Sequence, residues 1–439
     1  MYAVIKVEIT TDEKTSLIVD GQSKICNWLY NHLLETANSL KKQFWETKDL
    51  TLAKILYSER GLRNLLPDLK KEYVFLKSVH SSLLKNSALR LSSAIRKHKQ
   101  EKKRGWPKFR SWKKSWFSLL YDEPDKGWKV INDTLVLSLV GVGKLSFHIK
   151  DHEILCGKIL RNLRIVKQNG SYYAIFTVEK KVAEKKEIRK VIAFDPNHKN
   201  LCYGVDGDGN SIEIMPPYFL KKYDIRIDEI KSKRDHCKKR SQKMYDEKSK
   251  KEYFLPSKKW KKYNCVLERL LHKRREQTKT FMFTLSNLLC CTYDFIGMGD
   301  YVPHGGGITT KMRRAMNNRS LIGRFKDILA WTAEKSGKFY VEYDEKDTTR
   351  VCSNCGYKIE SGLLPSIRNW HCPNCSADHH RDENAAKNGL QKLLREFLTK
   401  GEKQFSLVPC SGLDFVKSRW AWRVFPSGVE KHLRGKNDI

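Results

Sequence analysis

Two CxxC pairs near the C-terminal end of the chain constrain its fold more than any other feature. Cys352 and Cys355 form the first pair, and Cys372 and Cys375 form the second, with sixteen residues between the pairs. This spacing is typical of a zinc ribbon, in which two tight turns direct four thiolates at one tetrahedral centre. We therefore predict a structural Zn²⁺ held by these four cysteines.

Three histidines lie close to the cysteine pairs. Because four sulfurs already complete a tetrahedral shell, we expect His371, His379 and His380 to lie at the surface or to face nucleic acid. A closed four-thiolate site performs no chemistry itself. Any reaction must use other residues, and Asp382, at the start of the predicted helix that follows, is the nearest candidate.

The net charge indicates the kind of partner. Lys and Arg outnumber Asp and Glu by 85 to 50 in 439 residues, which gives a formal net charge of +35. Such a chain repels itself unless a polyanion is nearby. The 11 Trp, 18 Tyr and 18 Phe offer rings that can stack on bases. We therefore expect nucleic acid as the partner.

The cellular compartment is indicated by what the sequence lacks. We find no uninterrupted apolar span of membrane length, and the start MYAVIKVEITTDEK does not resemble a signal peptide. The twelve cysteines, four of them in the metal pattern, fit a reducing compartment better than a disulfide framework. We expect a protein without a membrane partner in the prokaryotic cytoplasm or nucleoid, or in the nucleus of a eukaryote.

The first part of the chain predicts a sheet interrupted by helices. Residues 2–9 alternate as a strand, and apolar residues recur at helical spacing over 16–100. The period returns to two over about 128–179. This order predicts a small antiparallel barrel or sheet that the N-terminal strand completes, with the helices inserted into it.

A basic run interleaved with aromatic residues joins these helices to the later strands. It contains the sequence GWPKFR and extends to Trp116. Lysines and arginines alone usually form a solvated face, but rings between them favour phosphate contact together with base stacking. We predict nucleic-acid contacts from Lys102, Lys103, Arg104, Lys108 and Arg110.

The second half of the chain predicts a different domain. Three short strands come first, and the first of them ends at Asp195. A long basic helical hairpin (221–290) is followed by a strand ending at Asp300, a helix, a strand over 338–343, the cysteine pairs and a last helix. This is the layout of an RNase H-like domain, in which strand one is central, strand four lies beside it and strand five beside strand four.

In that layout carboxylates from separate elements converge. Asp195 ends strand one, Asp382 begins the last helix, and a third acid is expected near the end of strand four or five. Three carboxylates suit a pair of Mg²⁺ ions about 3.5–4 Å apart, which serve phosphodiester hydrolysis. One Asp at a strand end or helix start is usually structural, so the order of the set favours catalysis.

The chain resembles the TnpB family of transposon-encoded RNA-guided nucleases, which is related to miniature type V CRISPR effectors and to eukaryotic Fanzor proteins. The resemblance covers roughly residues 1–395 and rests on the cysteine pairs followed by HHRDENAAKN, the strand ending in Asp195, the basic hairpin, and GWPKFR ahead of a Ser- and Tyr-rich stretch. It implies a multidomain α+β fold with these parts: a wedge β-barrel (1–15 and 111–187), an inserted helical recognition domain (16–110), an RNase H-like RuvC nuclease domain (188–347 and 377–400), an inserted zinc ribbon that binds target nucleic acid (348–376), and a basic, aromatic C-terminal tail (401–439).

The middle acid departs from the family pattern. Typical members carry a Glu at the end of strand four, where this chain has Gly299. Asp300 is one candidate, one position late and one methylene shorter. Glu345, just past strand five, is the candidate that we favour, because some relatives have moved the Glu to that region. Glu342 is a weaker third candidate, and a fourth possibility is that the acid is lost and the protein only binds DNA.

The resemblance also implies an activity. Guide RNA pairs with target double-stranded DNA beside a short motif that the protein reads. A RuvC site formed by Asp195, Glu345 and Asp382 with two Mg²⁺ then cuts the DNA. The expected partners are the guide RNA and the target DNA, with the chain a monomer or a homodimer on one RNA.

Three further arginines complete the predicted site. Arg381 is a candidate to hold the scissile phosphate, and Arg313 and Arg314, on a predicted basic helix, are candidates to contact nucleic acid. Two functions of other classes stay open at this point. One is a guided DNA-binding repressor with a disabled site, and the other is an unguided zinc-ribbon protein that binds nucleic acid.

Overall fold

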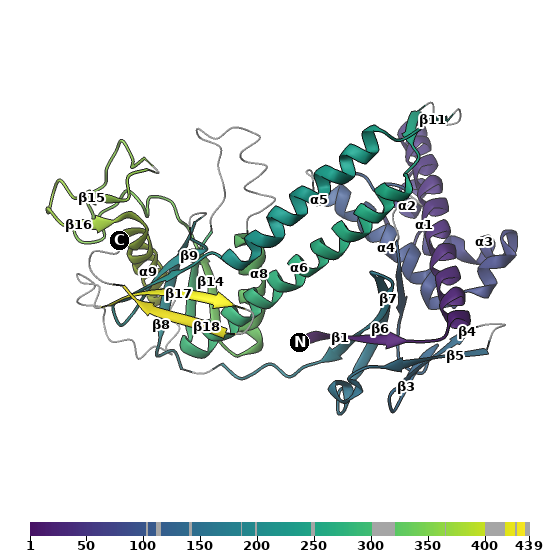
Figure 1. Ribbon diagram of the computed structural model, residues 1–439, viewed down its shortest axis with the longest axis horizontal. Coiled ribbons are helices and arrows are strands. Elements are labelled where there is room, and N and C mark those ends of the chain that lie inside the picture. Colours follow the sequence, from purple (N-terminus) through teal and green to yellow (C-terminus); the bar gives the residue numbers. More distant parts are fainter. Residues whose placement is uncertain are drawn as a thin grey trace. The chain divides into compact units, whose positions relative to one another are not determined.

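The computed structural model describes most of the chain, and it divides into two compact units (Figure 1). Unit 1 is Met1–Lys180 and unit 2 is Lys181–Ile439. No helix in the described part combines the length and the apolar character that a membrane span requires. The described residues are 1–101, 104–110, 116–139, 143–185, 187–197, 200–246, 251–300, 321–364, 366–399, 418–425 and 428–434.

Unit 1 contains a seven-stranded antiparallel sheet. Its strands are β1 (Tyr2–Thr10), β2 (Ser118–Tyr121), β3 (Trp128–Ile131), β4 (Thr134–Leu139), β5 (Gly143–Ile149), β6 (Leu160–Gln168) and β7 (Ser171–Glu179). Their order is β2-β6-β7-β1-β5-β4-β3, so the N-terminal strand is central. β1 pairs with β7 from Tyr2 opposite Glu179 to Ile9 opposite Tyr172.

The closed barrel predicted for this unit is not observed. Within the strands that the structure describes, no ladder joins the edge strands β2 and β3, so the sheet is open. Both edge strands have only four residues. A barrel closes when its two edge strands form a hydrogen-bonded ladder with each other, with all strands tilted and staggered. Edge strands of four residues are short for such a ladder.

The helices of unit 1 lie between β1 and β2 in the chain and share one core with the sheet. They are α1 (Glu13–Thr47), α2 (Leu50–Tyr57), α3 (Leu66–Glu72) and α4 (Ser81–Gln100), with short 3-10 helices at Arg63–Leu65 and Val74–Ser78. A third 3-10 helix, His152–Leu155, lies between β5 and β6. α1 begins where the Asp12 carboxylate accepts a hydrogen bond from Thr15 N at 2.7 Å. Leu33 of α1, Leu91 of α4 and Phe176 of β7 are fully buried in that common core.

Unit 2 is built on a second seven-stranded sheet, of mixed direction. Its strands are β8 (Val191–Pro196), β9 (Cys202–Asp206), β10 (Asn210–Ile214), β13 (Phe295–Gly299), β14 (Phe339–Tyr343), β17 (Ser418–Phe425) and β18 (Gly428–Leu433), in the order β14-β13-β8-β9-β10-β17-β18. β8, β13 and β14 run parallel, whereas β8, β9 and β10 are antiparallel. The strand order predicted from the sequence, five-four-one-two-three, is confirmed.

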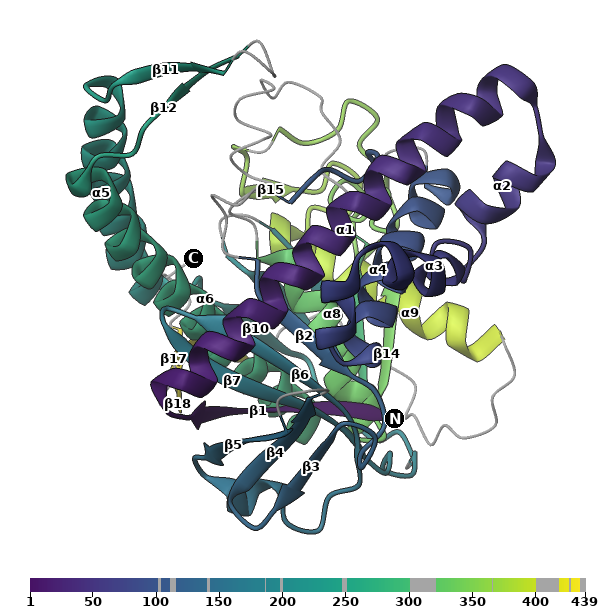
Figure 2. The same ribbon diagram turned by 90° about the vertical axis from the view of Figure 1, so that its right-hand side faces the viewer.

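The remaining elements of unit 2 are helices and two small ladders. The predicted basic hairpin consists of α5 and α6, and β11 and β12 form a ladder at its far end (Figure 2). The bounds are α5 (Lys221–Lys239), α6 (Lys258–Thr292), α8 (Ile322–Lys335), α9 (Arg381–Thr399), a 3-10 helix at Tyr218–Leu220, β11 (Lys243–Asp246), β12 (Lys251–Phe254), β15 (Asn369–His371) and β16 (Asp378–His380).

Helices cover both faces of the second sheet. Phe194 of β8 is buried with side chains of α6 and α8, whereas Val191 and Ala193 are buried with Leu390 and other residues of α9. Side chains alternate between the two faces along a strand. Asp195 therefore lies on the face that α9 covers.

Candidate functional site

Asp195 is buried at the C-terminal end of β8, with only 7% of its surface exposed. Burial raises the pKa of its carboxyl well above the usual range, and the carboxylates of Glu345 and Asp382 raise it further. Arg381 and Arg368 act in the opposite direction. The three acids predicted from the sequence are thus close enough to repel one another, an arrangement that favours cation binding.

Asp382 lies in the first turn of α9 and is held by a residue that sequence reasoning missed. Its carboxylate is buried, and Nη1 of Arg368 donates to both oxygens at 2.7 and 2.9 Å. Arg368 comes just before β15, in a segment without periodicity, so no local pattern indicated this contact. Arg381 is half-buried, and its Nε has no hydrogen-bond partner among the described residues.

The space around Gly299 bears on the choice among the candidates for the middle acid. A Cβ at this residue would overlap Oε1 of Glu345 and lie 2.6 Å from its Cδ, so the Glu345 carboxyl fills the place of a residue-299 side chain. Asp300 is exposed, and its Oδ1 accepts a hydrogen bond from Glu345 N at 3.1 Å. Glu342 is paired with Lys326 of α8 at 3.1 Å. The geometry therefore favours Glu345 over both alternatives.

The four predicted zinc ligands form a separate, compact cluster. Their sulfurs all lie within 4.8 Å of one another, with Cys352 Sγ 3.7 Å from Cys375 Sγ and Cys355 Sγ 3.6 Å from Cys372 Sγ. A tetrahedral ion with Zn–S bonds of about 2.3 Å separates its sulfurs by about 3.8 Å. All four are free of disulfides. The cluster can therefore hold zinc.

The acid set is spaced more widely than the thiols. Among the described residues, the four cysteines are the only group of three or more His, Cys, Asp or Glu whose ligand atoms lie within 4.8 Å of one another. The ligand atoms of a single ion must all lie close to one another. The carboxylates that hold a pair of ions can lie farther apart, because each ion contacts only some of them. The spacing of the acids is compatible with the second arrangement.

The expectation that His379 faces the surface or nucleic acid is wrong. His379 is buried, its Nε2 lies 3.0 Å from Cys352 Sγ, and its ring lies 4.5 Å from that of Trp370. Burial lowers the pKa of the imidazole. The physical reason is the alternation of β16, which turns His379 inward and leaves His380 half-buried. His371, on β15, is exposed as expected.

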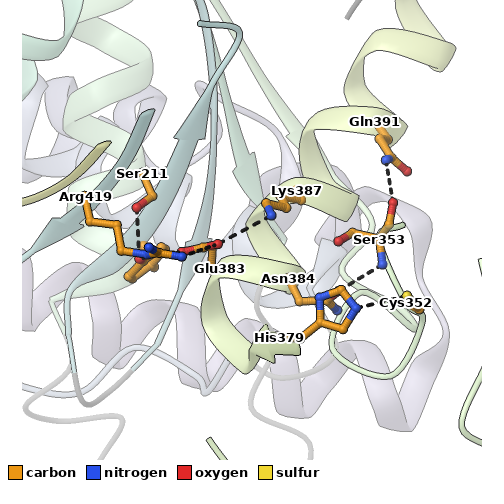
Figure 3. Close-up of polar contacts among 10 residues, drawn as sticks. Ser211, Cys352, Ser353, His379, Glu383, Asn384, Lys387, Gln391 and Arg419 are labelled. Carbon is orange, nitrogen blue, oxygen red and sulfur yellow. Dashed lines mark hydrogen bonds and ion pairs between the residues drawn. The ribbon is translucent and has the colours of Figure 1, made fainter. Parts of the chain in front are cut away.

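One face of α9 carries amide side chains that bind the first cysteine turn (Figure 3). Asn384 accepts a hydrogen bond from Ser353 N at 2.9 Å and donates to Val351 O at 2.8 Å. Asn388 also donates to Val351 O, at 2.7 Å, and Gln391 donates to Ser353 O at 3.0 Å. The helix that carries Asp382 is therefore bound directly to the cysteine ribbon.

The basic residues predicted to contact nucleic acid have different surroundings in the structure. Lys108 is exposed, and Arg104 is exposed with an ion pair to Glu101 at 3.2 Å. The predictions for Lys102, Lys103, Arg313 and Arg314 lie outside the described residues.

Arg110, from the same basic run, packs inside unit 1. Its guanidinium carbon lies 3.8 Å from the centroid of the Tyr30 ring, and Nη1 donates to Asn27 Oδ1 at 2.8 Å. Its backbone N donates to Asn31 Oδ1 at the same distance. These contacts give Arg110 a role in the fold of the unit.

Comparison with known proteins gives two matches in sequence. A family model described as "Cas12f1-like, TNB domain" matches residues 323–389, which include the cysteine ribbon and the first turns of α9. Two TnpB-like proteins of Acanthamoeba polyphaga mimivirus, L79 and L770, are each 31% identical to this chain over 142 residues. In this matched part the chain is similar to TnpB-like proteins. The match covers 31% of this chain and 27% of each viral relative, so the chain spans about a quarter of their length.

Comparison of folds gives a longer match. A cryo-EM structure of a Cas12f1–sgRNA–target DNA complex aligns with a TM-score of 0.55 over 88% of this chain and 98% of the Cas12f1 chain. The two sequences are 10% identical, so the likeness concerns the fold alone. The mixed α and β multidomain architecture thus resembles that of a Cas12 effector.

Proposed function

We propose that this chain is an RNA-guided DNA endonuclease with a single RuvC-type site. The observation that carries the proposal is the acid set of Asp195, Glu345 and Asp382. The acids come from the ends of two parallel strands and the start of the helix that covers them. The strand order and the similarity to TnpB-like proteins support the same function.

The acid set fits divalent cations, which prefer oxygen ligands. Asp195, Glu345 and Asp382 would hold two Mg²⁺ ions, which when bound supply an activated water and stabilise the leaving oxygen. Burial, and then repulsion from the carboxylates of Glu345 and Asp382, raise the pKa of Asp195, so the fully ionised set needs positive charge nearby. Arg368 supplies part of it, and we assign Arg381 to the scissile phosphate.

The other parts take the roles that the family suggests. We assign 1–15 and 111–187 to a wedge, 16–110 to target recognition, 188–347 with 377–400 to the RuvC domain, and 348–376 to a zinc ribbon that binds target nucleic acid. The net charge of +35 supports guide RNA and target DNA as partners, because neutralised phosphates provide most of such binding.

Purification from cells that express the native locus tests this function. We expect a discrete RNA to co-purify, and the complex with Mg²⁺ to linearise plasmids that carry the matched target beside one enriched flank. Retention of the target without cutting would instead support the guided repressor. Absence of any discrete RNA would overturn the proposal.

Exchange of the middle acid between two backbone positions tests the role of Glu345. Glu345→Ala is expected to abolish cleavage, and the double variant Gly299→Glu/Glu345→Ala to regain part of it. The reason is that the two side chains occupy the same space. Asp300→Asn should reduce the rate about tenfold at most, because only one hydrogen bond to the Glu345 backbone is weakened. Rates are compared on one matched plasmid.

The control for this exchange is Gly299→Glu alone. It places two carboxyl groups in one space and should lower activity below that of the double variant. Normal cutting by Glu345→Ala together with complete loss in Asp300→Asn would show that Asp300 is the middle acid.

A further inference from the structure

The C-terminal end of the described chain forms part of the central sheet of unit 2. β17 pairs in parallel with β10, from Ser418 opposite Asn210 to Trp422 opposite Ile214, and β18 pairs with β17 in antiparallel fashion. Trp422 is buried in the core shared with α6 and α8. The sequence did not decide whether the tail docks or binds RNA, and its described part is an integral pair of strands.

Arg419 extends from β17 to a buried carboxylate on α9 (Figure 3). Its Nε lies 3.0 Å from Glu383 Oε2, and its Nη2 donates to Oε1 at 3.4 Å. The side chain of Glu383 is only 6% exposed, and Lys387 Nζ and the Tyr203 hydroxyl each lie 3.4 Å from it. Strands β9 and β17 and helix α9 thus meet at this one carboxylate.

Glu383 follows Asp382 directly in the first turn of α9. Successive residues of a helix project about 100° apart around its axis. The Glu383 carboxylate points toward β9 and β17, and Asp382 projects toward the acid set. A fixed direction for Glu383 therefore limits rotation of this turn, and with it the direction of Asp382.

Loss of the Arg419 charge would alter this arrangement. A buried carboxylate without its main cation is costly, and it either gains a proton or turns toward water. Lys387 stays as a partner on the same helix, but it cannot hold α9 against the sheet. The first turn of α9 would then be free to rotate by the amount that Glu383 needs to reach solvent.

We propose that Arg419 is a positioning residue that acts through Glu383 to orient Asp382 in the acid set. Arg368 holds Asp382 from the ribbon side, and Arg419 fixes the same turn from the C-terminal strands. The C-terminal segment thereby contributes to metal binding without touching the metal. This inference rests on the proposed nuclease function.

The experiment measures Mn²⁺ affinity of the full-length protein by calorimetry, with Asp195→Asn as the blank that identifies binding at the acid set. Arg419→Gln is expected to weaken this affinity about 10–100-fold, the usual effect of losing a residue that orients a metal ligand. Arg419→Lys should recover part of the affinity. The Mg²⁺ concentration for half-maximal cleavage should rise in the same order.

Arg434→Gln is the matched control. Arg434 also comes from the C-terminal segment and pairs with a buried carboxylate, Glu213 of β10, but that carboxylate is not next to a catalytic acid. Both arginine variants should lose similar thermal stability, while only Arg419→Gln loses Mn²⁺ affinity. Equal Mn²⁺ affinity in the two variants would overturn the positioning role.

The proposed function and the inference fail in different ways. If the wild-type protein shows no Mn²⁺ binding that depends on Asp195, both the proposal of a metal-dependent nuclease and the positioning role of Arg419 are overturned. If the wild-type protein binds Mn²⁺ and Arg419→Gln leaves that affinity unchanged, only the inference falls. If Arg419→Gln does not fold, the double variant Arg419→Ala/Glu383→Gln, which removes both charges, is measured instead. Unchanged Mn²⁺ affinity in that variant would also overturn the inference.

Discussion

Asp195→Asn is expected to abolish DNA cleavage and to leave the binding of guide RNA and target intact. Metal-bound oxygens contribute several kcal/mol to stabilising the charge of a phosphoryl transition state, so loss of one ligand should lower the rate by about three orders of magnitude. Guided binding depends on base pairing and phosphate contacts instead. Cleavage and target retention are measured on the same purified complex.

The stability of Asp195→Asn separates loss of chemistry from loss of fold. The folded-state pKa of Asp195 is raised above that of the unfolded chain, so this group destabilises the fold as the pH rises above the unfolded-state pKa. The penalty is complete above the folded-state pKa and is absent in acid. A neutral Asn removes this penalty. The variant should therefore melt at the same temperature as the wild type or higher at pH 8 without divalent cations, and the difference should vanish as the pH falls.

Asp206→Asn is a control that should lose stability but keep cleavage. Asp206 is also buried, but its carboxylate accepts hydrogen bonds from Asn210 N at 2.7 Å and Tyr293 OH at 3.2 Å. Its neutralisation should lower the melting temperature and leave cleavage measurable. Unimpaired cutting by Asp195→Asn would remove the nuclease proposal.

The parts of unit 2 that sequence reasoning anticipated are those with local signals. Apolar runs and the order of elements predict the strand order, and alternation along β8 places Asp195 on the α9 face. The CxxC spacing predicts the thiol cluster. The alternation of β8 and the CxxC spacing each lie within one short segment, and the strand order follows from the succession of such segments along the chain.

The parts that were missed depend on contacts between distant segments. Arg368 binds Asp382, and Arg419 binds Glu383, but neither arginine lies in a periodic element that indicates its partner. Parallel pairing of β17 with β10 joins residues about 200 positions apart, and nothing in either strand specifies the other.

Two errors had local causes that were within reach. The burial of His379 follows from the alternation of β16, and a complete thiol shell does not require a histidine outside it to be exposed. The barrel was implied by the family resemblance, because the alternation of the strands left both a barrel and an antiparallel sheet possible. Its short edge strands β2 and β3 leave it open within the described residues.

Removal of the zinc ligands is expected to abolish cleavage although no acid is altered. Bound Zn²⁺ supplies the folding free energy of a small ribbon, about 10–16 kcal/mol in isolated zinc-finger peptides. In this chain the ribbon carries Arg368, and its first turn binds Asn384 and Asn388 of α9. A disordered ribbon would therefore release Asp382 from its partner and leave the amide groups of α9 without acceptors.

The double variant Cys352→Ser/Cys355→Ser tests this coupling. We expect loss of one zinc per chain by elemental analysis, rapid proteolysis within 348–376, and loss of most cleavage. Guide RNA should stay bound, because we assign the ribbon to the target nucleic acid. Cys265→Ser, an exposed cysteine of α6, is the matched control and should change none of these. A zinc-free double variant that cuts at the normal rate would show that Asp382 is positioned without the ribbon, because the Arg368 contact would then be dispensable.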